Sequence, residues 1–153
     1  MAIGLLEVMK PELRHHLVCM YKEMNLPIPF IYRNIEGNLH CVPSDLLDVF
    51  TSKPIVLSIR SKHVQGNSTF LNKIFKCEFE VESSSLLHNG SVDIQLDSMG
   101  YHIADLHGNV FDSLDVASTM IHMTNILLFH VNIEDLMEQR EQLLTISVIT
   151  ILN

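Results

Sequence analysis

The chain contains no tryptophan, only three cysteines and no long apolar run. Cys19, Cys41 and Cys77 are scattered without a C-x-x-C pair, which argues against a disulfide framework and a zinc ribbon and favours a reduced setting. No stretch reaches the roughly 18 apolar residues that a membrane-spanning helix needs, and the N-terminus lacks the basic start and continuous apolar segment of a signal peptide. We therefore expect a cytoplasmic protein without a membrane partner.

Basic side chains are also scarce. Ten lysine and arginine residues stand against eighteen aspartate and glutamate residues, so the formal charge is −8. This balance disfavours nucleic-acid binding, because the phosphate backbone requires a basic surface. The nine histidines form no H-x-x-x-H pair, and neither a nucleophile elbow nor a cysteine–histidine signature is present, so a metalloenzyme or a hydrolase is not indicated.

A chain of 153 residues suits one domain with a substantial hydrophobic core, and its patterning divides near residue 50. Residues 1–50 are expected to form an N-terminal flank. Apolar residues recur with helical periodicity from Ile3 to Met24, and Pro11 is expected to begin or kink that helix. The segment Leu26–Phe30 reads as an extended connector, and Ile31–Phe50 as polar turns followed by a short helix from Ser44.

The second part, 51–153, opens with a strand, a loop and a helix. The run Pro54–Ile59 is apolar and rich in β-branched residues, as in a buried strand. Apolar side chains then recur at helical spacing between Ser68 and Phe75. This order is the setting in which a phosphate-binding loop occurs.

The loop itself matches the phosphate-binding pattern G-x-x-x-x-G-K-[ST] in part. Gly66 and Ser68 occupy their positions, whereas Ser61 replaces the first glycine and Asn67 replaces the lysine. In that pattern loop N–H groups and a helix N-terminus surround the phosphates, the lysine reaches the β and γ oxygens, and the hydroxyl binds Mg²⁺. The alternative is an ordinary strand-to-helix connection capped by Asn67 or Ser68.

A second motif follows at a suitable distance. The strand-like run Val92–Leu96 and a short turn precede Tyr101–Leu106, in which Asp105 is followed three residues later by Gly108. GTPases place an aspartate near Mg²⁺ and a backbone N–H near the γ-phosphate in this way. The two motifs in this order favour a P-loop GTPase-like α/β fold, with a partly parallel sheet flanked by helices and an N-terminal helical extension.

The segments Gly66–Phe75, Asn89–Gly90 and Asp105–Gly108 resemble the G domain of the very large inducible GTPases. The resemblance spans roughly Pro54 to Asn132 and implies a partial G domain over 51–153. This chain departs from the family at Asn67 for the lysine, at His88 and Asn89 for the switch threonine and arginine, and at His107 for a glutamate. It also contains no N-K-x-D motif, so base specificity follows from the resemblance alone.

The resemblance implies GTP and Mg²⁺ as ligands if the site is competent. The candidate nucleotide-binding residues are Ser61, Lys62, Gln65, Gly66, Asn67, Ser68, Thr69, Asp105 and Gly108, with Ser68 and Asp105 also as metal ligands. A neutral amide at Asn67 cannot replace an ammonium group, so weak or lost binding of guanine nucleotide and weak or absent GTPase activity are expected. Lys62 could swing back to the phosphates or remain a solvated loop residue. The competing hypothesis is a pseudo-GTPase interaction module, or gene remnant, that binds no nucleotide.

The C-terminal part is expected to complete the sheet. The run Thr124–Asn132 reads as a buried central strand, and Glu134–Leu144 as a helix with acidic residues in its first turn. For Thr145–Leu152 β-propensity indicates a strand, whereas the resemblance favours the rest of a long helix, which we prefer. Because the chain stops soon afterwards, we expect an apolar sheet edge open to a protein partner or to self-association.

Overall fold

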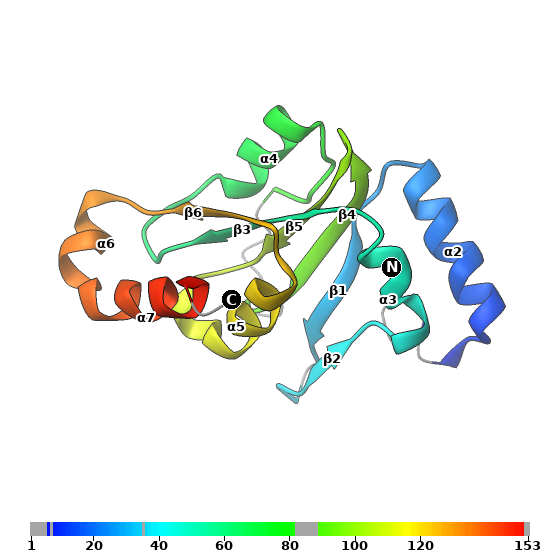
Figure 1. Cartoon of the computed structure of the whole chain (residues 1–153), viewed down its shortest axis with the longest axis horizontal. Coiled ribbons are helices and arrows are strands. Elements are labelled where there is room, and N and C mark those ends of the chain that lie inside the picture. The colour runs from blue at the N-terminus through cyan, green and yellow to red at the C-terminus, as the bar shows by residue number, and fades with distance from the viewer. Residues whose placement is uncertain (1–5, 7, 35, 82–88, 152–153) are drawn as a thin grey trace.

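The computed structural model describes residues 6, 8–34, 36–81 and 89–151, without the side chains of 147–151. It is an α/β fold in which six strands form one mixed sheet, in the order β2-β1-β4-β5-β3-β6, with helices on both faces (Figure 1). The predicted α/β class, with a partly parallel sheet flanked by helices, is confirmed. None of the described helices is both long enough and apolar enough to cross a membrane.

The strands are β1 (Ile28–Arg33), β2 (Leu39–Cys41), β3 (Ile55–Arg60), β4 (Val92–Ser98), β5 (Tyr101–Leu106) and β6 (Ile126–His130). The helices are α2 (Pro11–Glu23), α3 (Leu47–Phe50), α4 (Asn67–Phe75), α5 (Leu114–Met123), α6 (Ile133–Glu138) and α7 (Arg140–Ile151), and 3₁₀ turns precede α3 and α5. Strands β5, β3 and β6 run parallel, whereas β2, β1, β4 and β5 form antiparallel neighbours.

Strand alternation separates two hydrophobic layers. Ile55, Leu57 and Ile59 of β3 face a large core to which α2, α3, α5 and α7 contribute side chains. Val56 points to the opposite face, where Leu71 of α4 packs over it in a smaller cluster. Helices α4 and α5 therefore lie on opposite faces of the sheet (Figure 1).

The N-terminal portion contributes more to the sheet than the sequence suggested. Helix α2 begins at Pro11, as expected, because proline is well suited to the first turn of a helix. The predicted extended connector and polar turns in fact contain strands β1 and β2. Strand β1 pairs with β4 on one side and with β2 on the other. Prolines obscured β1, but Pro29 lies where the β1–β4 register shifts, a position at which a strand tolerates proline.

The C-terminal portion corrects one expectation and confirms another. Strand β6 lies at the edge of the sheet, not at its centre, and Ile126 is 43% exposed. Its continuous apolar character arises because Leu127 and Phe129 pack on the large core while Leu128 adjoins the cluster under α4. The last segment is helical in α7, as preferred over a strand.

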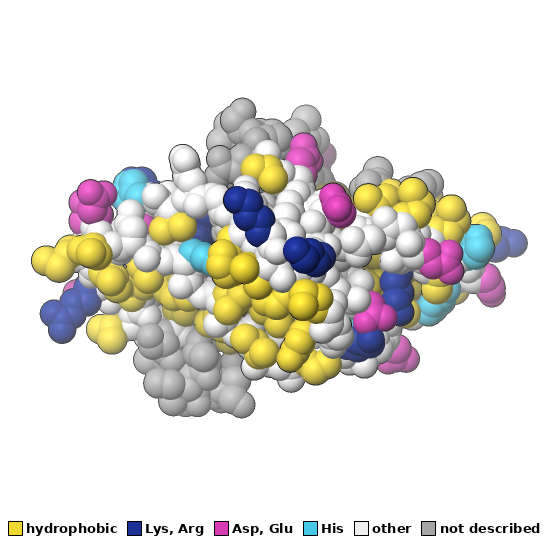
Figure 2. Space-filling view, turned by 90° about the horizontal axis from the view of Figure 1, so that it is seen from above, with side chains coloured by type: hydrophobic (Ala, Val, Ile, Leu, Met, Phe, Trp, Pro, Cys, Tyr) yellow, Lys and Arg dark blue, Asp and Glu magenta, His cyan; other side chains and the backbone are white. Residues whose placement is uncertain are grey.

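Exposed hydrophobic side chains gather on the face of the molecule seen from above (Figure 2).

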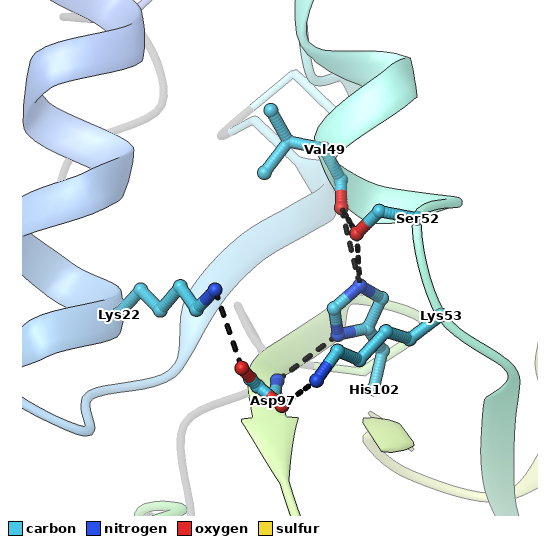
Figure 3. A network of polar contacts seen from close by, with 6 residues as sticks. All are labelled: Lys22, Val49, Ser52, Lys53, Asp97 and His102. Atoms are coloured by element: carbon cyan, nitrogen blue, oxygen red, sulfur yellow. Dashed lines mark hydrogen bonds and ion pairs between the residues drawn. The ribbon is translucent and has the colours of Figure 1, made fainter. Parts of the chain in front are cut away.

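A polar network joins the N-terminal flank to the neighbouring ends of β4 and β5 (Figure 3). The Asp97 carboxylate pairs with Lys22 of α2 at 3.3 Å and also with Lys53, and these contacts lower the pKa of Asp97. Nδ1 of His102 accepts the Asp97 backbone N–H at 3.0 Å, so its Nε2 carries the proton that faces the Val49 carbonyl at 3.1 Å. The neutral imidazole is therefore the form that this network requires.

We expect His102→Gln to flatten the acid dependence of stability. Burial lowers the pKa of His102 below its unfolded-state pKa of about 6.5. The stability that the neutral ring contributes is therefore present above about pH 6.5 and is lost as the pH falls from there through the folded-state pKa. The variant should lose about 1–2 kcal/mol of unfolding free energy near neutral pH and should decline less on acidification, as measured by urea unfolding. Exposed His122→Gln is the control, and an acid decline in His102→Gln equal to that of the wild type would contradict the assignment.

Candidate nucleotide-binding site

The loop from Ser61 to Gly66 lies at the carboxyl end of β3, between the ends of β5 and β6. The helix after β3 covers one face of the sheet, and the helix after β5 covers the other. In open α/β sheets such a switch point opens a crevice beyond the strand ends, and ligands bind there. The topology thus brings the loop and Asp105, which lies near the end of β5, to the same edge of the sheet.

Helix α4 begins directly after Gly66, whose φ of 84° favours glycine. The Phe70 N–H donates to the Gly66 carbonyl at 2.9 Å and closes the first turn. Among the described residues, no acceptor is found for the backbone N–H groups of 65–69. These five consecutive donors lie at the positive end of the α4 dipole, which is the arrangement that attracts an anion.

Asp105 connects this helix start to the sheet. Its Oδ1 accepts a hydrogen bond from Asn67 Nδ2, and its Oδ2 accepts one from Ser68 Oγ, each at 2.6 Å. Asp105 is fully buried, and Asn67 and Ser68 are each only 4% exposed. Asn67 therefore uses its amide to satisfy a buried carboxylate, and its side chain is turned toward the sheet.

Burial raises the pKa of Asp105, and the donors Ser68 and Asn67 together with nearby His107 oppose that rise. Asp93 of β4 lies directly opposite Asp105 across the antiparallel ladder, so the two like charges also raise its pKa. Asp93 in turn contacts His107 Nε2 at 3.0 Å. Burial disfavours the charged form of His107, but the pairing with Asp93 outweighs it and raises the pKa of His107.

Gly108 follows this cluster and packs closely on the turn before β4. Its φ is 89°, and a Cβ at this position would lie 2.6 Å from Oδ1 of Asn89. The neighbouring Gly90 N–H donates to the His107 carbonyl at 2.9 Å, which holds the two turns together. Gly108 therefore has a steric role here. No hydrogen bond between described residues links it to the loop of residues 61–66.

The first half of the loop is held by a residue that the sequence did not identify as part of the site. Asp135 of α6 is fully buried and accepts hydrogen bonds from Ser61 Oγ, from the His63 N–H at 3.2 Å and from the His63 ring at 2.7 Å. Burial opposes ionisation, but these hydrogen bonds outweigh it and lower the pKa of Asp135. The only sequence signal is the acidic first turn of α6, where Asn132 caps the Asp135 N–H at 2.7 Å.

Arg60 is the other residue missed. Its Nη1 donates to the Val64 carbonyl within the loop, and its side chain is partly buried. Lys62, for which the sequence left open a swing back to the phosphates or a solvated position, is exposed and forms no ion pair within the described part of the chain. The sequence alone does not separate Arg60 from Lys62, because the difference depends on the face of the sheet to which the Arg60 side chain points.

We expect Gly108→Ala to lower the unfolding free energy by about 1–3 kcal/mol, because the new Cβ meets Asn89 and the residue must keep a positive φ. Gly100→Ala is the matched control: its φ is 87°, but a Cβ there meets nothing within 4 Å. Urea unfolding of both variants separates backbone strain from collision. Equal losses would mean that the contact with Asn89 has no energetic weight.

The predicted site residues therefore differ in where the structure places them. Gly66, Asn67, Ser68 and Asp105 meet, and the N–H groups of Gln65 and Thr69 belong to the same row of free donors. Ser61 is bound to Asp135, Lys62 is exposed, Gly108 packs against Asn89, and His88 lies outside the described residues. Among the described residues, no group of three or more His, Cys, Asp or Glu side chains could hold a metal ion.

No protein-family model, curated protein or solved structure matches the chain.

Proposed function

We propose that this chain binds the phosphates of a guanine nucleotide, together with Mg²⁺, in the loop between β3 and α4. The observation that carries the proposal is the row of free N–H groups at 65–69, directly beside the Ser68–Asp105 hydrogen bond. Backbone donors and a helix dipole bind phosphate oxygens without any side chain. The proposed fold is accordingly that of a P-loop GTPase-like domain.

The sheet topology supports this proposal. The loop follows a parallel strand that has parallel neighbours on both sides, and the flanking helices leave to opposite faces. A partial phosphate-loop pattern is stronger evidence for phosphate binding when it lies in a strand–loop–helix unit at a switch point of the sheet. The choice of guanine rests on the resemblance to the very large inducible GTPases.

Ser68 and Asp105 have the chemistry required of Mg²⁺ ligands. A hydroxyl and a carboxylate are hard oxygen donors, and Mg²⁺ in nucleotide sites uses one or two such groups together with phosphate oxygens and water. The absence of a larger acidic cluster among the described residues fits that mode better than a self-sufficient metal site. When bound, Mg²⁺ would neutralise negative charge on the β and γ phosphates.

Hydrolysis is proposed to be lost. Asn67 provides a neutral amide that is already bonded to Asp105, where an intact loop has an ammonium group for the transferred phosphate. His107 is bonded to Asp93, which draws the ring toward β4 and away from a role in orienting water. The site is therefore proposed to bind nucleotide without turnover.

A specific observation favours the alternative of an interaction module that binds no nucleotide. Both oxygens of Asp105 are already satisfied within the chain, so no unmet buried charge in this cluster demands a ligand. The module would use its apolar surface, namely Ile126 on the open β6 edge and Phe70 and Ile74 on α4, which are 43%, 42% and 53% exposed. A protein partner or a second copy would then cover that surface.

We expect a fluorescent GTP analogue to bind the wild-type chain saturably, and binding to weaken at least about tenfold when Mg²⁺ is removed. Ser68→Ala should cause a similar loss with Mg²⁺ present and should abolish the metal dependence. Thr119→Ala, which removes an exposed hydroxyl from α5, is the control and should leave affinity unchanged. A wild-type chain that gives no saturable signal would favour the interaction module.

We also expect Asn67→Lys to tighten binding of the analogue by about tenfold or more, because charge-assisted contacts to phosphate are about twice as strong as neutral ones. GTP turnover should stay near background in the wild type, as measured by phosphate release at saturating nucleotide. A wild-type rate typical of intact GTPases would disprove the loss of hydrolysis. Unchanged affinity in a folded Asn67→Lys variant would indicate that the loop does not surround a phosphate.

A further inference from the structure

Arg60 lies at the end of β3, immediately before the loop. Strand alternation places its side chain on the same face as Ser58, and Ser58 is in register with Asp105 of the neighbouring strand β5. Arg60 therefore points to the face that carries α4, Asp105 and the free N–H groups. Within the described part of the chain, its side chain forms a hydrogen bond from Nη1 to the carbonyl of Val64.

The guanidinium of Arg60 retains most of its hydrogen-bonding capacity. A guanidinium has five N–H donors, and the Val64 carbonyl uses one nitrogen. Within the described ranges no carboxylate lies at ion-pair distance from Arg60, whereas Arg14 pairs with Asp45 and Arg33 with Asp115. A partly buried arginine that is tied to a loop carbonyl, but not to a carboxylate, has donors available for another anion.

We propose that Arg60 supplies the positive charge that the loop lacks at Asn67 and contacts the phosphates of the bound nucleotide. This inference rests on the proposed nucleotide site. The Val64 carbonyl holds the guanidinium beside the loop just before the free donors at 65–69, so backbone N–H groups and a cation converge on one region. The planar fork suits two phosphate oxygens at once, which a point-charge ammonium does not.

The surroundings of Arg60 agree with this role. Its charge is one of those that oppose protonation of His107, so its field extends to the Asp93–Asp105–His107 cluster. The two aspartates make that cluster negative, and an incoming phosphate would be repelled without a compensating cation. Lys62 is a weaker candidate, because its exposed side chain has no contact that directs it inward.

The test is Arg60→Gln, which removes the charge but keeps an amide donor for the Val64 carbonyl. Affinity for the fluorescent GTP analogue, and for inorganic tripolyphosphate as a competitor, is measured with Mg²⁺ at two salt concentrations. We expect an approximately tenfold loss for both ligands and a shallower salt dependence. Lys62→Gln should stay within about twofold of the wild type, and Lys73→Gln, on the exposed side of α4, is the charge-matched control.

A double-mutant cycle separates charge from loop geometry. In an Asn67→Lys background the lysine supplies the charge, so Arg60→Gln should cost clearly less than it does in the wild type. An undiminished cost would mean that the substitution only distorts the loop, and the inference would fail. If Arg60→Gln does not fold, Arg60→Met replaces it: the charge is removed in the same way, so an affinity that stays at the wild-type value counts against the proposal.

The outcomes distinguish this inference from the proposed function. If the wild type binds and Arg60→Gln binds equally well, or if Lys62→Gln causes the larger loss, Arg60 is not the cation while the nucleotide site stands. If the wild type does not bind but Asn67→Lys does, Arg60 does not replace the missing lysine. If neither binds, both the site and the role of Arg60 are rejected.

Discussion

The two hydrogen bonds to Asp105 are the interaction on which the site depends. They join the end of β5 to the first turn of α4, and thus link the two elements between which the loop must pass. A buried carboxylate without partners would be costly, so Asn67 and Ser68 are fixed in place by the need to satisfy it. Fixing these two residues also fixes the direction in which the remaining N–H groups of the helix start point. The arrangement of these N–H groups is in this sense a consequence of satisfying one carboxylate.

A second buried carboxylate, that of Asp135, holds the first half of the loop. Asp135 binds Ser61 and His63, so the early loop is drawn toward α6 and the His63 N–H is used internally. The Val64 N–H also turns back, to the Ser61 carbonyl at 3.3 Å. From Gln65 onward, the N–H groups up to Thr69 have no acceptor among the described residues. The two aspartates therefore divide the loop into a part that is anchored and a part that is open, and Arg60 contacts the boundary between them at Val64.

The sequence predicted what depends on local pattern. Apolar periodicity located β3, α4, β4 and β5, and the spacing of Gly66, Ser68 and Asp105 identified side chains that do meet. It failed where position in the sheet decides. The prolines before Phe30 concealed β1, whose pairing with β4 is long-range, and the apolar run of β6 gave no sign that the strand lies at an edge. Asp135 and Arg60 were missed for the same reason, because their roles arise from contacts that only the folded chain creates.

The substitution at Asn67 can be understood as a change in what the loop stabilises. A lysine at this position would carry its ammonium group toward a phosphate, and without ligand it would be a long cationic side chain over a nearly closed site. Asparagine is short enough to donate to Asp105 at 2.6 Å while remaining 4% exposed, so the buried carboxylate is satisfied within the chain. In the proposed site, a neutral amide at this position would attract phosphate less than an ammonium group would. The backbone donors follow from the helix start whatever residue stands at 67, whereas the affinity of the proposed site would depend on whichever cation the fold brings near them.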